Sequence, residues 1–125
     1  MQDRPDAAEL IAAVRHFLEH EVLPIQQEHR GKFRTLIAAN ALAIVERELS
    51  VGSAPAQQER ERLRALLDTP YGDVAALRLE LARRIRSGEA DHGPWRQAVF
   101  TATQTGVEAK LAVANPHFLE GRDVR

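Results

Sequence analysis

Apolar residues recur every three to four positions along most of the chain, the spacing that places side chains on one face of an α-helix. In the first such segment the apolar residues are Ala7, Leu10, Ile11, Val14, Phe17 and Leu18. The same periodicity predicts helices over residues of about 4–27, 32–49, 54–67, 73–87 and 94–114, with a polar tail over 116–125. No segment alternates apolar and polar residues between turn signals as a half-buried strand does. The pattern therefore predicts an all-α fold.

Capping and helix-breaking residues mark the ends of these predicted helices. Asp3 is expected to cap the first helix. Pro24 either ends or kinks that helix, because proline lacks an amide hydrogen and its ring clashes with the preceding turn. Asp73 is expected to cap the fourth helix, and Gly88 is well placed to terminate it. The fifth helix is expected to open at Pro94, where the missing amide hydrogen costs nothing.

The second predicted helix contains the run LIAANALAIV and is apolar on most of its sides. A helix of this kind is expected at the centre of the fold. With 125 residues, of which 44% are hydrophobic, the chain is long enough for one continuous core and too short for two substantial ones. Short connections between helices favour antiparallel neighbours. We therefore expect a single domain, residues 1–125, built as an up-and-down bundle of four to five helices.

Two polar residues, Asn40 and Lys110, interrupt apolar helices. Asn40 lies on the apolar stripe formed by Phe33, Leu36, Ile37 and Ile44, so we expect it to be buried. A buried amide without a partner costs about 1 to 3 kcal/mol, which favours hydrogen bonds that fix how the helices meet. The alternative is a contact to a ligand or a partner. Lys110 either extends its stem along the core with its ammonium in water, or shares an interhelical pocket with Asn40.

The charge balance and composition exclude several classes of function. Lys and Arg number 17 against 18 Asp and Glu, so no net positive field draws the chain to nucleic acid or to an anionic membrane surface. Cysteine is absent, which excludes disulfides, thiolate catalysis and cysteine-based metal sites. No stretch approaches the roughly 20 apolar residues of a membrane-spanning helix, and the opening MQDRPDAAEL lacks the apolar run of a signal peptide. A cytoplasmic location is expected.

The candidates for metal or catalytic chemistry are few. His16 and His20 have the spacing by which two imidazoles share a metal, but no third ligand is identified and both are expected to face solvent. Glu89 and His92 form a single Glu-x-x-His in a loop, whereas di-metal bundles carry this motif twice on helices. No glycine-rich phosphate loop and no nucleophile elbow is present. The arginines of the third and fourth helices alternate with glutamates, which indicates a solvated face. We expect no catalytic residue, cofactor or metal.

Four blocks of the sequence resemble successive parts of a small bacterial family of helical proteins built on a domain of unknown function. They are RPDAAELIAAVRHFLEHEVLP, NALAIVEREL, DVAALRLELARRIRSGE and KLAVANPHFL, in the same order and over nearly the whole chain. Members of that family are often encoded beside acyl-CoA dehydrogenase-like proteins and aminoglycoside-phosphotransferase-like kinases, and some are labelled acyl-CoA dehydrogenase-related. The resemblance implies an association with such enzymes. The chain itself is far shorter than an acyl-CoA dehydrogenase and has nothing that cradles a flavin.

Two functions are compatible with these observations. The favoured one is a non-catalytic accessory or interaction protein that binds an acyl-CoA dehydrogenase-like or kinase-like protein through an exposed apolar patch. Trp95, Phe100 and Phe118 are the residues expected to contribute to that patch, which also suits a homodimer. The alternative is a helical bundle that binds a small acyl-CoA-type molecule, or a minor enzyme, with an interhelical pocket near Asn40 and Lys110.

Overall fold

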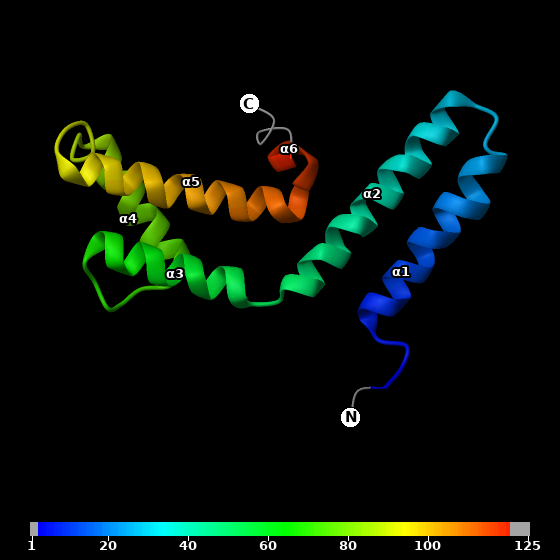
Figure 1. The fold of residues 1–125 in the computed structure, drawn as a ribbon, viewed down its shortest axis with the longest axis horizontal. Helices are drawn as coiled ribbons and strands as arrows, with labels where there is room; N and C mark the ends of the chain where they lie inside the picture. Colours follow the sequence, from blue (N-terminus) through cyan, green and yellow to red (C-terminus); the bar gives the residue numbers. More distant parts are fainter. Residues whose placement is uncertain (1–2, 121–125) are drawn as a thin grey trace. The chain divides into compact units, whose positions relative to one another are not determined.

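The structure is a computed structural model that describes residues 3–120, and this part of the chain is all-helical (Figure 1). Its α-helices are α1 (Ala7–Phe17), α2 (His29–Val51), α3 (Ala54–Leu67), α4 (Val74–Arg86), α5 (Pro94–Ala114) and α6 (Pro116–Glu120). A π-helical turn, Leu18–Val22, and a 3-10 turn, Leu23–Ile25, follow α1. Part of the predicted polar tail, residues 121–125, lies outside the described residues. Within residues 3–120, no helix combines the length and the apolar character needed to cross a membrane.

The chain divides into two compact units, Met1–Gly52 and Ser53–Arg125. The amino-terminal unit contains α1 and α2, and the carboxyl-terminal unit contains α3 to α6. Each unit has its own set of helix contacts, α1 with α2 in the first and α3 with both α4 and α5 in the second. The all-α prediction is confirmed for the described residues, whereas the arrangement as one up-and-down bundle stays a prediction.

Local sequence signals explain where the helices of the amino-terminal unit begin and end. Asp6, rather than the expected Asp3, caps α1, because its Oδ1 accepts a hydrogen bond of 2.9 Å from the Glu9 amide. Near Pro24 the backbone passes through the π-helical turn into the 3-10 turn, so the first helix ends there and does not reach residue 27. At the far end of α2, Gly52 adopts a φ of 62°, which suits a residue without a Cβ.

In the carboxyl-terminal unit, α3 and α5 cover the ranges that the sequence predicts. Asp73 caps α4 through a hydrogen bond of 2.8 Å from the Ala76 amide to its Oδ1. Gly88 has a φ of 91° just beyond α4, and Pro94 stands at the start of α5. The chain beyond Pro116 forms the short helix α6 where the sequence predicts only a polar tail.

The buried core of the carboxyl-terminal unit is a leucine cluster formed by Leu63, Leu67 and Leu77. These side chains come from α3 and α4 and are between 3% and 6% exposed. Leu81 and Trp95 pack against the cluster, and the Trp95 Nε1–H donates a hydrogen bond of 3.0 Å to the Leu66 carbonyl. This bond satisfies the one polar atom that the indole brings toward the core.

The amino-terminal unit is a helical hairpin in which a small residue is buried. Ala39 of α2 is 5% exposed. Among the described residues of this unit, it is the apolar residue that is buried. The helix pair is also joined by an ion pair of Arg15 in α1 with Glu46 in α2. Glu19, one turn after Arg15, accepts a second bond from the same guanidinium at 3.2 Å. The hairpin interface is therefore partly polar, unlike the leucine cluster.

Candidate functional site

Asn40 is exposed in the structure, and its predicted burial is wrong for the described conformation. The residues of α2 that face α1 include Ala39 and Glu46, which lie seven positions apart and so share one side of the helix. Asn40 follows Ala39 by one residue and is turned about 100° away from that side. The stripe that carries Asn40 also leaves Phe33, Leu36 and Ile37 between 52% and 57% exposed. The sequence pattern of α2 correctly indicates an apolar stripe that includes Asn40. However, α1 packs against a different side of α2, the one that carries Ala39.

Five further apolar side chains of α1 and α2 are exposed and are here called the hairpin face: Leu10, Val14, Phe17, Val45 and Leu49. These side chains are 53%, 50%, 50%, 37% and 46% exposed, respectively. The first three follow one another at spacings of four and three along α1, so they share one side of that helix. The sequence pattern predicts that these three residues of α1 are buried, because their spacing is that of a buried stripe.

The ion pair between Arg15 and Glu46 sets the register of the hairpin face. Val14 directly precedes Arg15, and Val45 directly precedes Glu46. In an antiparallel pair, the residues that precede two facing residues turn toward the same side of the hairpin, because a two-fold axis relates the two helices. Val14 and Val45 are therefore expected on the same side of the hairpin.

The hydrogen bonds of this ion pair favour the charged form of both groups. The hydrogen bond to Glu46, supported by the one to Glu19, raises the pKa of the Arg15 guanidinium above its ordinary value. The same bond lowers the pKa of the Glu46 carboxyl below its ordinary value of 4.5. Both groups consequently stay charged around neutral pH, and the pair holds the register in the form described.

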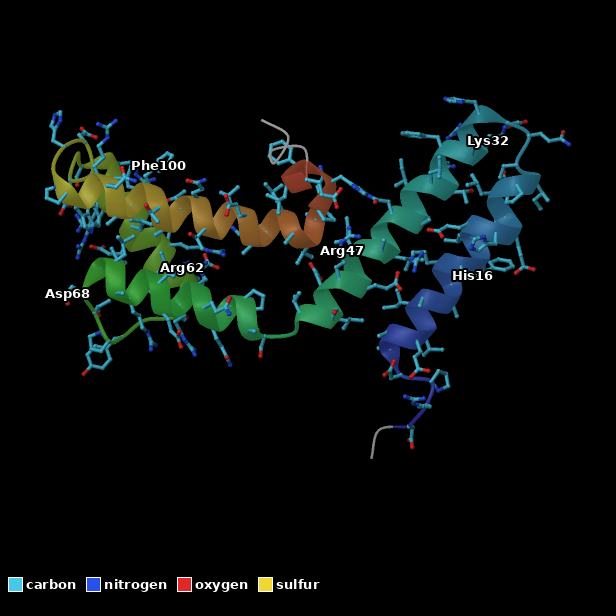
Figure 2. All side chains as sticks on the ribbon, in the orientation of Figure 1. His16, Lys32, Arg47, Arg62, Asp68 and Phe100 are labelled. Atoms are coloured by element: carbon cyan, nitrogen blue, oxygen red, sulfur yellow. The ribbon has the colours of Figure 1, made fainter. Side chains whose placement is uncertain are left out.

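The aromatic residues expected on a partner surface occupy different environments. Trp95 is half-buried against the leucine cluster, with the Arg84 guanidinium 5.9 Å from its ring centre, so its role is in packing. Phe100 is 63% exposed on α5 (Figure 2), and Phe118 is 54% exposed on α6. Trp95 is therefore not available for a partner surface. Phe100 and Phe118 are exposed and remain candidates for it.

Lys110 lines a groove of about 210 Å³ within the carboxyl-terminal unit. The groove is formed by α3, α4 and α5, and its polar lining includes Glu59, Arg62, Arg78 and Lys110. Leu63, Leu81 and Val107 supply its apolar surface. Asn40 belongs to the amino-terminal unit and is not among the lining residues. The groove is thus an interhelical site beside Lys110. The other polar residues that line it were not identified from the sequence.

Glu59 and Arg78 form a two-pronged ion pair at this groove. The Nε and Nη2 atoms of Arg78 each donate a hydrogen bond of 2.7 Å to a different oxygen of the Glu59 carboxylate. These bonds lower the pKa of Glu59, and the charges of Arg78, Lys110 and Arg62 lower it further. No hydrogen bond or ion pair joins Arg62 or Lys110 to another residue within 3–120. The groove therefore holds one acid and three cations.

The pair of His16 in α1 and His20 in the following π-helical turn does not assemble into a larger cluster, and neither does the Glu-x-x-His segment. The rings of His16 and His20 lie 4.0 Å apart and are tilted by 56°, and both residues are exposed (Figure 2 shows His16). Glu89 accepts a hydrogen bond of 3.0 Å from the Ser87 hydroxyl. Among the described residues, no three His, Cys, Asp or Glu side chains come close enough together to hold a metal ion.

Comparison with known proteins gives a family and no activity. The model of one protein family, described as "Domain of unknown function (DUF6285)", matches residues 25–118, which include α2 to α5 and most of the groove-bearing unit. No curated protein and no solved structure matches the chain. Because the match covers well over half of the 125 residues, the chain belongs to this family, the domain of unknown function DUF6285.

Proposed function

We propose that this protein is a non-catalytic interaction protein whose hairpin face binds a helical surface of another protein. The observation that carries the proposal is the set of half-exposed apolar side chains on α1 and α2. Exposed apolar side chains favour a protein–protein contact that covers them, because leaving them in water is unfavourable.

Burial of the hairpin face would stabilise a complex. Full burial of a Val, Leu or Phe side chain stabilises a complex by roughly 1.5–3 kcal/mol, so half-exposed side chains can still supply about half of that each. Five of them supply several kcal/mol before the entropic cost of association is subtracted. A partner that contributes two helices would enclose the face in a four-helix arrangement.

The family resemblance suggests which partner to test first. It implies an acyl-CoA dehydrogenase-like or a phosphotransferase-like enzyme, and we propose that one of these is bound in the cytoplasm of a bacterial cell. The occupant competing with these enzymes is a second copy of this chain, because two hairpins related by a two-fold axis also form a four-helix arrangement.

The test is a pull-down of the tagged protein, expressed at native level in its own host, with identification of co-purifying proteins and their stoichiometry. Phe17→Gln places an amide on the hairpin face, and Leu79→Gln makes the same kind of change at a 70% exposed position on α4. Recovery of one of the two enzymes near one to one, lost in Phe17→Gln and kept in Leu79→Gln, supports the proposal. A protein that purifies alone and sediments as a monomer contradicts it. If the chain instead forms a dimer that Phe17→Gln dissociates, the partner on the hairpin face is a second copy of this chain and not an enzyme.

A second candidate function is the binding of a small acyl-CoA-type molecule, with or without a minor enzymatic activity. The observation that favours it is the groove beside Lys110, which combines cationic and apolar lining. Asn40 does not line this groove, so in this candidate function Lys110 acts with residues of its own unit.

A further inference from the structure

The groove between α3, α4 and α5 carries more positive charge than its own acid neutralises. Glu59 is engaged through both of its oxygens by Arg78, at 2.7 Å each. Arg62 and Lys110 line the same groove and, within residues 3–120, form no hydrogen bond or ion pair with another side chain. With one carboxylate and three cations, the lining has an excess of two positive charges. This excess is local, since the whole chain has a formal net charge of −1.

The two unengaged cations come from facing helices. Arg62 extends from α3, and Lys110 extends from the second half of α5 (Figure 2 labels Arg62). The charges of both lower the pKa of Glu59, so both cations lie near the same carboxylate. An anion that enters the groove beside Glu59 therefore meets a guanidinium from one side and an ammonium from the other, and guanidinium groups bind carboxylate and phosphate oxygens in pairs.

The remaining lining is apolar with one hydroxyl. Leu63, Leu81 and Val107 supply aliphatic surface, and Thr103 supplies a hydroxyl that can donate or accept. Leu63 is only 6% exposed, so it belongs to the floor of the groove and to the leucine cluster at once. An inorganic anion would use the cations and leave the aliphatic surface in water. An anion with a short hydrocarbon arm uses both.

Gly106 leaves room for the Arg62 side chain beside α5. A Cβ added at Gly106 would come within 3.9 Å of the Arg62 Nη2 atom, which is an ordinary contact. A longer side chain at this position would extend into the groove, whose lining includes Gly106. A glycine in the middle of a helix is less favourable than alanine by roughly 0.5–1 kcal/mol, so substitution here is compatible with folding.

We infer that this groove binds a small amphiphilic organic anion, with a carboxylate or phosphate head between Arg62 and Lys110 and a short aliphatic arm against Leu63, Leu81 and Val107. The inference deepens the second candidate function, on which it rests, and is independent of the hairpin face. The Glu59–Arg78 pair has a positioning role, because it occupies the one acid of the groove and leaves the other two cations to the ligand.

The test is titration of the isotopically labelled full chain with hexanoate, butyl phosphate and inorganic phosphate, followed by amide NMR shifts at low ionic strength. The expected shifts are confined to α3, α4 and α5 around the groove, and hexanoate and butyl phosphate bind more tightly than inorganic phosphate. Arg62→Gln and Lys110→Gln each weaken binding by about tenfold, because each removes a charge-assisted hydrogen bond. Added salt weakens binding as well, since the groove is open to solvent.

Two further variants separate a lost site from a lost fold. Gly106→Leu fills the groove and is expected to abolish the shifts while the spectrum stays that of a folded protein. Arg86→Gln removes an exposed cation at the end of α4, outside the lining, and is expected to leave the affinity unchanged.

The outcomes distinguish the site from the wider function. Shifts that map elsewhere, or that survive Arg62→Gln, Lys110→Gln and Gly106→Leu, overturn the groove as the site and leave small-molecule binding as a function. The absence of any shift with all three probes overturns both. Equal affinity for inorganic phosphate and butyl phosphate overturns the amphiphilic character of the ligand.

Discussion

The two compact units bury their apolar residues in different ways. In the carboxyl-terminal unit, three helices surround Leu63, Leu67 and Leu77, and Trp95 closes one side of the cluster. In the amino-terminal unit, two helices meet on Ala39 and on an ion pair, while large apolar side chains remain half exposed. A helix in a pair can bury only the side that faces its single neighbour, so a hairpin with apolar residues on several sides retains surface for a further partner. The amino-terminal unit is therefore the interaction candidate, and the carboxyl-terminal unit supplies an internal core and a groove.

The comparison is tested most strongly by truncating a core leucine. Leu77→Ala is expected to lower the free energy of unfolding by about 2–5 kcal/mol, because it removes a side chain that is 3% exposed and leaves a cavity. Leu36→Ala in the amino-terminal unit removes the same atoms from a side chain that is 52% exposed, and is expected to change this free energy by less than about 1 kcal/mol. Urea denaturation followed by circular dichroism measures both. Equal losses in the two variants would mean that the exposed stripe of α2 is covered in solution.

Overpacking at the hairpin interface is expected to have the next largest effect. Ala39→Leu adds atoms at a position that is only 5% exposed, and is expected to destabilise the protein by about 1–3 kcal/mol. Ala38→Leu makes the same change at the neighbouring, exposed position and serves as the control. Thermal unfolding of the two variants measures the difference. A hairpin that accepts leucine at residue 39 as readily as at residue 38 would show that Ala39 does not set the helix spacing.

The smallest expected effect concerns the acid of the groove. The folded pKa of Glu59 lies below its ordinary value of 4.5, chiefly through the hydrogen bonds from Arg78. Its contribution to stability is therefore fully present above pH 4.5, and is lost as the pH falls through the lower, folded pKa. Because Arg78 is half exposed, the contribution is expected to be about 0.2–1 kcal/mol at pH 7.

Comparison of the wild type with Glu59→Gln at pH 7 and at about pH 2 measures this contribution. The difference in unfolding free energy between the two proteins should shrink on acidification, because protonated Glu59 no longer attracts Arg78. Glu61→Gln, at an exposed position on the same helix, is the matched control. A difference that is independent of pH would assign the effect of Glu59 to packing and not to charge.

Local signals predicted the ends of α3 and α5 and, within one residue, those of α4, because such signals act over a few residues. The cap at Asp73 and the start at Pro94 follow from one side chain each, and the structure has both where the sequence predicts them. The first helix shows the limit of this reasoning. Both Asp3 and Asp6 are plausible caps around Pro5, and only Asp6 has its carboxylate placed to accept from an amide three residues on.

The groove was only partly predictable. Lys110 stands out in the sequence because it interrupts an apolar helix, and the structure places it in the lining. Arg62 and Glu59 do not stand out, because they belong to a face on which arginine and glutamate alternate in the pattern of a solvated helix surface. Their grouping depends on α4 and α5 packing beside α3 and is invisible in the sequence of α3 alone.

The sequence by itself determined the all-α class, the bounds of α3 and α5 and, within one residue, those of α4, since periodicity and capping are properties of each segment. The tertiary structure decided which side of α2 is buried. That helix is apolar on most of its sides, so its own pattern does not choose between the stripe with Asn40 and the side with Ala39. The choice depends on a second helix: α1 packs on the side of α2 that carries the buried Ala39 and the Glu46 that pairs with Arg15. Asn40 is left exposed for that reason.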